Sequence, residues 1–453
     1  MISKKSLTDI SLLISAHHIG QDAVFNNISI DTRTLKIGNL FVAIKGPNFD
    51  GHNFIGEALD KGASAIVTEN HIGKTNNYLK VNDSLEFLIS LANYQRKLFE
   101  GKVICITGSN GKTSTKEIIG NLLREIHHTH QTLGNQNNKL GVTLTLLDLE
   151  KEHDSLVIEI GTSTRGEISD LSSIVKPHIA LITNVALAHS EGLGSIKDIA
   201  IEKGDILDFL DTEGVAILPR DSLFYEDWNK RAGNRKVISF GIHESSDFKV
   251  SSIKVDLRKS ITVFKLRFQG KERFCSINGI GEHNAINAAS ALATLHALGI
   301  DFQISIKDLM GVKLPYRRLT VCHGINGSLI IDDTYNANPD SIKAAINVIS
   351  SEDKLRKIFI AGQMAELGLN AEILHKDIIE YSNSRMDEIW CIGDLWKISV
   401  KKYNSKVKYF VNNQELLAYA LNEIDNKCLV LLKGSRSSAV DQIADLLKLD
   451  KRN

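Results

Sequence analysis

The chain has 453 residues, 43% of them hydrophobic and 24% charged, and its 54 basic and 54 acidic side chains leave no formal net charge. This composition is typical of globular proteins and argues against disorder, while the length favours two to four domains. Neutrality removes the simplest argument for a nucleic-acid partner, and no apolar run reaches the ~18–20 residues of a membrane span. Five scattered cysteines without a CxxC pair argue against a disulfide framework or a zinc site. We therefore expect a soluble, cytoplasmic, multidomain protein.

The first 100 residues alternate short extended runs with turns and helix-like pieces. The runs are NISID, LFVAIK and ASAIVTE. Apolar runs of this length, separated by helical pieces, predict a small α/β unit at the N-terminus.

A second pattern begins near residue 101. The compact run VICIT leads into a glycine-rich turn and then into TSTKEIIGNLLREI at helical spacing. Further apolar runs follow in SLVIEIG, HIALITN and GVAILP, each separated by helical stretches. This alternation predicts a mostly parallel sheet that is covered on both faces. Residues 237–280 alternate apolar and polar side chains and predict antiparallel strands, and residues 281–300 then favour a helix.

After Pro315 the strand–helix pattern resumes in LIIDDTY, KIFIAG, EIWCIG and CLVLLKG, which predicts a Rossmann-like unit. We therefore predict an α/β protein with three domains. Their boundaries are residues 1–100, 101–314 and 315–453. The central domain would be of the P-loop type, with a mostly parallel sheet and an additional antiparallel segment.

The glycine-rich turn at residues 108–113, GSNGKT, lies between a predicted strand and a predicted helix. Glycines allow backbone N–H groups to close around phosphate oxygens, and the helix N-terminus adds donors and a favourable dipole. Lys112 would then pair with the β- and γ-phosphates, and the Thr113 hydroxyl would reach Mg²⁺. The spacing departs from Walker A, because Gly108 precedes Gly111 by three positions instead of five. The alternative is an ordinary turn with a surface lysine.

Two further residues, Glu159 and His189, are candidates for metal binding. Glu159 ends the run SLVIEIG, and His189 follows the run HIALITN, so both are expected at the carboxyl ends of strands, where such sheets bind ligands. A carboxylate and an imidazole there could ligate Mg²⁺. Lys203 lies on a predicted helix beside Glu202 and Asp205. Taken alone, it reads as a solvated lysine with salt-bridging neighbours.

Five segments, in order, carry a resemblance to a known family. They are TGSNGKTST, EIGTSTRGEI, ITNVALAHSEGLGS followed by EKGDI, GEHNAINAASALA, and DDTYNANPDS. With them the chain resembles the Mur ligases, ATP-dependent amino-acid and peptide ligases that build the peptidoglycan precursor. YNANP, LGNQNNKLGVTLTLL and LKGSR look most like the branch that adds D-alanyl-D-alanine to UDP-N-acetylmuramoyl-tripeptide. The resemblance spans nearly the whole chain.

The resemblance implies an acyl-phosphate mechanism that uses ATP and two Mg²⁺ ions. It implies that Thr113 binds the first ion, while Glu159, His189 and a carbamylated Lys203 bind the second. Together with Lys112, these last three residues would be catalytic.

The resemblance also implies residues that bind the nucleotide and the other substrates. The nucleotide site would comprise Gly108, Ser109, Asn110, Gly111, Lys112, Thr113, Ser114, Asn284, Asn287, Arg318, Asp333 and Asn336. The UDP-linked peptide or the dipeptide would meet Thr32, Arg33, Asp50, Asn137, Asn138 and Lys433. Simpler interpretations are capping or surface roles for the two helix asparagines, a structural turn in the N-terminal domain, and a surface loop for Lys433.

Some segments depart from the family pattern. Gln363 stands where an Asp is expected and Leu369 where a Glu is usual. Ser163–Arg165 stand where an Asn or Ser is usually followed by His-Pro or His-Gln. These departures bear on fine specificity more than on reaction type, and the third peptide residue, lysine or diaminopimelate, is not distinguished. Rival interpretations are another ligase of the superfamily or a nucleotide-binding regulator without catalysis. We expect UDP-muramoyl-tripeptide and D-alanyl-D-alanine as partners, no nucleic acid, no membrane span, a monomer, and closure at joints near residues 101 and 315.

Overall fold

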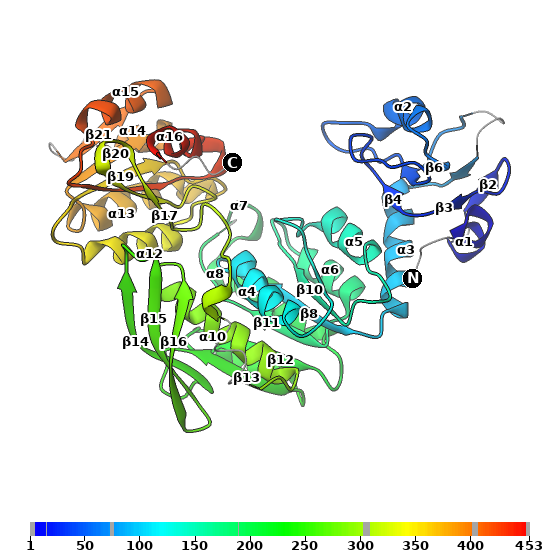
Figure 1. Ribbon diagram of the computed structural model, residues 1–453, viewed down its shortest axis with the longest axis horizontal. Coiled ribbons are helices and arrows are strands. Elements are labelled where there is room, and N and C mark those ends of the chain that lie inside the picture. The colour runs from blue at the N-terminus through cyan, green and yellow to red at the C-terminus, as the bar shows by residue number, and fades with distance from the viewer. Residues whose placement is uncertain are drawn as a thin grey trace. The chain divides into compact units, whose positions relative to one another are not determined.

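The computed structural model describes residues 5–14, 16–72, 77–188, 190–301, 309–400 and 406–449 (Figure 1). The chain divides into two compact units. Unit 1 comprises Met1–Val103, His128–Ile158 and Ser173–Lys176, and unit 2 comprises Ile104–His127, Glu159–Ser172 and Pro177–Asn453. The expected α/β class is confirmed, while the division into three domains stays a prediction.

The N-terminal part of unit 1 is a small sheet with the strand order β2-β7-β6-β5-β4, beside a two-stranded pair, β1-β3. All neighbours in the larger sheet are parallel except β2 and β7. Phe41, Ile66 and Tyr78 form part of its buried core. The strands are β1 Lys5–Ser6, β2 His17–Ile19, β3 Val24–Phe25, β4 Ile28–Ser29, β5 Leu40–Val42, β6 Ala65–Thr68 and β7 Tyr78–Lys80.

Two helices of unit 1, α3 and α5, begin at side-chain caps. Helix α3, Ser84–Leu98, begins after Asp83, whose carboxylate accepts hydrogen bonds from the amides of Leu85 and Glu86. The other helical elements are α1 Leu7–Ile14, η1 Gly51–Phe54, α2 Ile55–Asp60 and α5 Lys139–Leu147.

The central sheet has nine strands in the order β16-β15-β14-β13-β12-β11-β8-β10-β9. Pairing is parallel from β14 through β8, whereas β15 is antiparallel to both β14 and β16. The predicted antiparallel segment is thus confirmed for β14, β15 and β16. Its first residues, 237–241, were predicted wrongly, because they lie in β13, which is parallel to both of its neighbours. The strands are β8 Lys102–Thr107, β9 Thr129–Gln131, β10 Ser155–Glu159, β11 Ile179–Ile182, β12 Val215–Pro219, β13 Lys236–Gly241, β14 Phe248–Asp256, β15 Ile261–Phe268 and β16 Lys271–Asn278.

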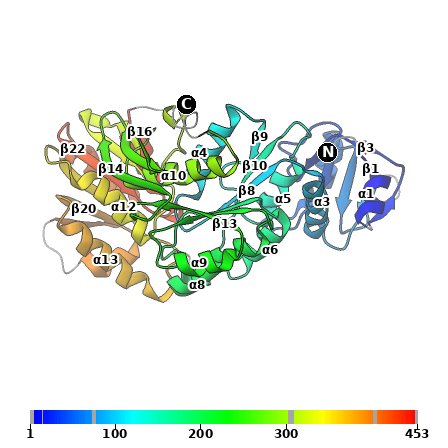
Figure 2. The ribbon, with the colours of Figure 1, turned by 90° about the horizontal axis from the view of Figure 1, so that it is seen from below.

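Helices cover both faces of this sheet in unit 2. Figure 2 shows α4, Lys112–Arg124, and α10, Glu282–Ala297, on one side, with α8, Ile196–Gly204, and α9, Tyr225–Ala232, on the other. Because helices cover both faces of the sheet, side chains on both sides of each strand are buried, and the strand sequences are continuous apolar runs. The remaining helical elements are α6 Glu167–Val175, α7 Ser190–Leu193, η2 Asp205–Phe209 and η3 Leu309–Gly311.

The C-terminal part of unit 2 is a six-stranded sheet with the order β17-β18-β22-β19-β20-β21. Only β17 is antiparallel, so the sheet matches the predicted Rossmann-like pattern. Along β19, Ile358 and Ile360 join one apolar cluster and Phe359 and Ala361 join the other, as the two-residue period of a strand requires. The strands are β17 Thr320–His323, β18 Leu329–Asp332, β19 Arg356–Gly362, β20 Glu388–Ile392, β21 Val407–Phe410 and β22 Cys428–Lys433.

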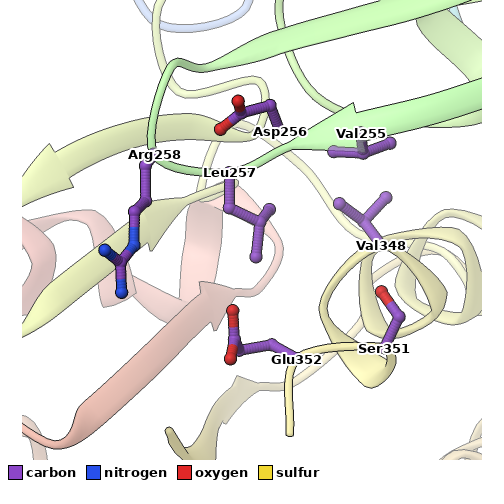
Figure 3. Close-up of a pocket in the computed structure, with 7 residues that line it drawn as sticks. All are labelled: Val255, Asp256, Leu257, Arg258, Val348, Ser351 and Glu352. Carbon is purple, nitrogen blue, oxygen red and sulfur yellow. The ribbon is translucent and has the colours of Figure 1, made fainter. Parts of the chain in front are cut away.

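Helix α12, Pro339–Ser350, begins with proline at its first position and with Asn338 as its cap. A cavity of about 340 Å³ lies between the C-terminal end of α12 and the turn after β14 (Figure 3). Val255 and Leu257 at this turn pack against the C-terminal core. The other helical elements are η4 Ile325–Gly327, η5 Gly368–Asn370, α13 Ala371–Asn383, α14 Asp394–Val400, α15 Asn413–Glu423, η6 Arg436–Ser438 and α16 Val440–Leu447.

All five cysteines of the chain are buried and none forms a disulfide. Burial raises the pKa of the Cys275 thiol to about 12, because the thiolate would lose its hydration. Among the described residues, no helix is long and apolar enough to cross a membrane.

Candidate active site

The glycine-rich turn connects buried strand β8 to helix α4, as the sequence predicts. Gly108 has φ 148° and Gly111 has φ 81°, in a region that side chains disfavour. A Cβ atom at Gly108 would lie 1.8 Å from Thr183 Oγ1, and one at Gly111 would lie 2.7 Å from Asn287 Oδ1. Both positions therefore require glycine, for their backbone conformation and for the space around them.

Two polar residues that follow β11 hold the shape of this loop. The amide of Ser109 donates to the Asn184 carbonyl at 3.0 Å, and the amide of Asn110 donates to Asn184 Oδ1 at 2.9 Å. The Thr183 hydroxyl donates to the Asn110 carbonyl at 2.6 Å. Sequence reasoning missed Thr183 and Asn184, although their position directly after an apolar run was a usable signal.

Lys112 lies over the loop that precedes it. Its Nζ donates to the carbonyl of Gly108 at 2.7 Å and approaches that of Ser109 at 3.4 Å. Burial lowers the pKa of the Lys112 amine and nearby Arg318 lowers it further, whereas Glu159 raises it. The amine is thus held at the loop in an environment that would favour an incoming anion.

Residues from the C-terminal part of unit 2 meet the loop. Arg318 donates to the Thr113 hydroxyl at 3.3 Å, and its guanidinium stacks 4.1 Å from the ring centroid of Tyr335. Asn338 Nδ2 donates to Asn110 Oδ1 at 2.8 Å. The structure therefore brings Arg318 to the phosphate loop, while Tyr335 and Asn338 are partners that sequence reasoning missed.

Lys433 and Asp333 form a buried ion pair of 2.6 Å beside these residues. Lys433 also donates to the Asn336 carbonyl at 2.8 Å, and the Leu319 amide donates to Asp333 Oδ1 at 3.2 Å. Because only 2% of Lys433 is exposed, the surface-loop interpretation of this lysine is wrong. Its ammonium fixes the segment after β18 against the end of β22.

Lys203 is 2% exposed, so the interpretation as a solvated helix lysine is wrong. Burial holds the pKa of its amine well below the ordinary value; the charge of Lys112 acts in the same direction, and Glu202 opposes both. Asp205, expected as a salt-bridge partner, binds Arg231 instead at 2.5 Å. Glu159 is also buried, at the end of β10. Glu159 and Lys203 thus both interact electrostatically with Lys112.

The donors available to a metal are mainly oxygens. Thr113 offers a hydroxyl and Glu159 a carboxylate, and such hard ligands suit Mg²⁺. His189 lies outside the described residues. Within the part of the chain that the structure describes, no three His, Cys, Asp or Glu side chains gather into a metal site. The expected second site would also need the carbamate on Lys203, so the metal assignment stays a prediction.

Helix α10 carries the two candidate asparagines and His283. Asn284 and Asn287 are buried, which excludes the interpretation as surface residues. Asn284 donates to the Ile280 carbonyl at 2.9 Å, and Asn287 lies against Gly111. Burial, together with the charges of Lys433 and Arg318, lowers the pKa of His283 to about 4, so its imidazole is neutral at pH 7. Ser114 is buried in the first turn of α4.

The predicted substrate residues of unit 1 make local contacts. Arg33 pairs with Asp31 at 2.6 Å, and Asp50 caps η1 and binds His52. Asn138 caps α5, and Asn137 precedes it. The Thr32 carbonyl accepts from Lys61 at 3.0 Å. These contacts fit structural turns, and the ligand roles of these residues stay predictions.

Comparison with known protein families accounts for three parts of the chain. Residues 24–96 match the family described as "Mur ligase family, catalytic domain". Residues 106–295 match "Mur ligase middle domain", and residues 317–436 match "Mur ligase, glutamate ligase domain". The phosphate loop, Glu159 and Lys203 fall in the middle match, and Arg318 in the last.

Individual relatives are similar over nearly the full length. The UDP-N-acetylmuramoyl-tripeptide–D-alanyl-D-alanine ligase of Buchnera aphidicola subsp. Acyrthosiphon pisum is 35% identical, covering 99% of each chain. A crystal structure of MurF from Acinetobacter baumannii has a TM-score of 0.91 at 31% identity, covering 98% of this chain and 99% of that one. MurF from Thermotoga maritima in complex with ADP has a TM-score of 0.83 at 28% identity, covering 93% and 96%. The resemblance in the sequence is thereby confirmed, and the chain belongs to the Mur ligase family.

Proposed function

We propose that this protein is an ATP-dependent ligase that joins D-alanyl-D-alanine to UDP-N-acetylmuramoyl-tripeptide in peptidoglycan precursor synthesis. The proposal rests on the hydrogen bond from Arg318 to the Thr113 hydroxyl. This contact brings groups from two parts of the chain together at one site that can bind an anion. The relatives named for this reaction support the two peptide substrates, and the relative solved with ADP supports an adenine nucleotide.

The reaction would proceed in two balanced steps. The terminal carboxylate of the tripeptide attacks the γ-phosphorus of ATP, an O–P bond forms, the bond to the β–γ bridging oxygen breaks, and ADP leaves. The D-alanyl-D-alanine amine then attacks the acyl carbon, inorganic phosphate leaves, and the amine nitrogen loses a proton. Because two anions meet in the first step, fixed positive groups must stabilise it. Lys112 and Arg318 would supply that charge.

Two Mg²⁺ ions would be held by oxygen donors of the site together with the imidazole of His189. Thr113 would bind one, and Glu159, His189 and carbamylated Lys203 would bind the other. Bound Mg²⁺ would supply neutralising charge to the phosphates. Carbamylation requires an uncharged amine, and the burial that lowers the pKa of Lys203 favours that form. The described donors therefore suit these ions once the lysine carries its carboxylate-like group.

The remaining substrate contacts are assigned by resemblance. Thr32, Arg33 and Asp50 would bind the UDP moiety, Asn137 and Asn138 the muramoyl-peptide, and Lys433 the acyl phosphate or the dipeptide. Asn284, Asn287, Asp333 and Asn336 would contact the nucleotide. We also propose a cytoplasmic monomer with three domains, residues 1–100, 101–314 and 315–453, that closes on its ligands.

A phosphate-release assay tests the function directly. Purified protein is incubated with ATP, Mg²⁺, UDP-muramoyl-tripeptide and D-alanyl-D-alanine, and each component is then omitted in turn. We expect release to require all of them, with one phosphate per amide formed. Phosphate release that is unchanged without D-alanyl-D-alanine, or a complete mixture that yields no amide, would contradict the proposal.

A further inference from the structure

Glu202 is a charged side chain that the proposed reaction does not use, yet it is only 4% exposed. It lies on α8 directly before Lys203. Its carboxylate accepts hydrogen bonds from the amide of Gly166 at 2.7 Å and the amide of Ile168 at 2.9 Å. The Thr162 hydroxyl also lies 3.3 Å from this carboxylate, but its one proton is closer to the Thr164 carbonyl, at 2.7 Å. The buried carboxylate of Glu202 is therefore satisfied by two backbone amides of one segment.

These donors belong to the segment that joins β10 to α6. Helix α6 begins at Glu167 and is preceded by Gly166, which has φ 89° and no side chain to cap the helix. The first amides of a helix need acceptors, and a negative charge there is favoured by the helix dipole. Glu202, which lies on helix α8, supplies both the acceptor oxygens and the negative charge at the start of α6. The same segment has a second, local acceptor, because Glu167 binds the amides of Ser163 and Thr164.

The contact links the two elements that carry the candidate metal-binding residues. Strand β10 ends at Glu159, three residues before Thr162, and Glu202 and Lys203 are consecutive on α8. Successive helix residues point about 100° apart, so Glu202 can bind the α6 segment while Lys203 points elsewhere. Holding the segment after Glu159 against α8 would restrain the positions of Glu159 and Lys203 relative to each other.

We propose that Glu202 is a positioning residue that sets the geometry of Glu159 and Lys203 for the ligation. The inference rests on the proposed function, because it gives these two residues a common task. Displacing a catalytic group by about 1 Å can cost on the order of 10²-fold in rate. Glu202 would therefore act on turnover and on the state of Lys203, and less on nucleotide binding at the phosphate loop.

The test compares Glu202→Ala, Glu202→Gln and Glu202→Asp with wild type. Exposed Glu213→Gln is the control, because it makes the same charge change where the side chain is in water. We expect Glu202→Ala to lower kcat on the order of 10²-fold with the KM for ATP within about twofold. Gln keeps one acceptor oxygen and Asp keeps the charge, so each should restore part of the rate. Circular dichroism gives the folded fraction by which every rate is divided.

A second measurement does not depend on turnover. Protein equilibrated with ¹³C-labelled bicarbonate and Mg²⁺ is examined by ¹³C NMR for a carbamate signal that Lys203→Ala removes. We expect the signal in wild type and in Glu213→Gln, and a reduced signal in Glu202→Ala. Wild-type protein without ligase activity would contradict the proposed function, and the carbamate signal would still test Glu202. The inference is overturned by a wild-type kcat and signal in Glu202→Ala, by losses that match its folded fraction, or by no signal in wild type.

Discussion

Two buried lysines of unit 2 show how differently the fold treats the same side chain. Lys448 is 5% exposed, and its ammonium contacts Asp332 at 2.5 Å, Tyr316 at 2.7 Å and Asp445 at 3.0 Å. Burial alone would lower its pKa, but these partners outweigh burial and raise it. For Lys203, burial and Lys112 lower the pKa and Glu202 compensates only in part. A buried lysine whose charge is balanced by acidic partners stabilises the fold. One whose burial is not balanced has a lowered pKa and is available for chemistry.

The largest expected effect comes from removing Lys203, the lysine whose burial is not compensated. We expect Lys203→Ala to lower the phosphate-release rate on the order of 10³-fold, the upper range for the loss of one electrostatic group at an active site. A small carboxylate such as acetate should restore part of the rate by occupying the place of the carbamate. Lys197→Ala, an exposed lysine on the same helix, is the control. Wild-type rates in Lys203→Ala without acetate would exclude the carbamate role.

The structural role of Lys448 is tested by removing its ion-pair partner, Asp332. Asp332→Ala leaves a buried ammonium without its closest carboxylate, which should lower the free energy of unfolding by about 3–5 kcal/mol. The double variant Asp332→Ala with Lys448→Met removes the charge as well, so it should regain part of that loss. Urea unfolding followed by tryptophan fluorescence measures both. Equal midpoints for wild type and Asp332→Ala would show that the ion pair contributes nothing to stability.

Arg318 sharpens the comparison, because its guanidinium stays charged where a lysine amine can lose its proton. Arg318→Lys loses the stacking on Tyr335 and the directed bond to Thr113. A charge-assisted hydrogen bond contributes about 1.5–3 kcal/mol, so we expect the KM for ATP to rise about tenfold or more. Arg385→Lys, an arginine stacked 3.9 Å from the ring centroid of Tyr381, is the matched control. A similar KM change in both variants would remove the special role of Arg318.

The smallest expected effect is on the pH dependence of stability, through the buried imidazole of His375. It accepts from the Met364 amide at 3.0 Å and donates to the Ala371 carbonyl at 2.6 Å, and burial lowers its pKa. The fold therefore favours the neutral ring. The stability from this preference is complete above the unfolded pKa of about 6.5 and is lost as the pH falls through the folded pKa.

The measurement is the unfolding free energy between pH 4 and pH 8. We expect it to fall less steeply toward acid pH in His375→Gln than in wild type, because glutamine takes up no proton. His17→Gln, at an exposed position, should follow the wild-type slope. Parallel curves for wild type and His375→Gln would mean that this ring does not contribute to acid sensitivity.

Local patterns in the sequence were enough to predict the phosphate loop and the antiparallel strands β14, β15 and β16. Both depend on neighbouring residues, namely a strand followed by glycines and a helix, or alternation along a strand. The contact between Asn110 and Asn338 spans 228 positions, and no local pattern encodes it. The burial of Lys203 was equally hidden, because its acidic neighbours look like those of a surface helix. Glu202 binds the α6 segment and Asp205 binds Arg231, and tertiary packing sets both contacts.

The burial of all five cysteines has a practical consequence for following motion in this protein. Thiol reagents must reach the sulfur atom, and burial keeps these five sulfur atoms away from a reagent in solution. A cysteine introduced at an exposed position would therefore react first with a maleimide dye, without removal of the native residues. Dyes on the two sides of a proposed joint would let energy transfer between them test the proposed closure, in the otherwise native chain.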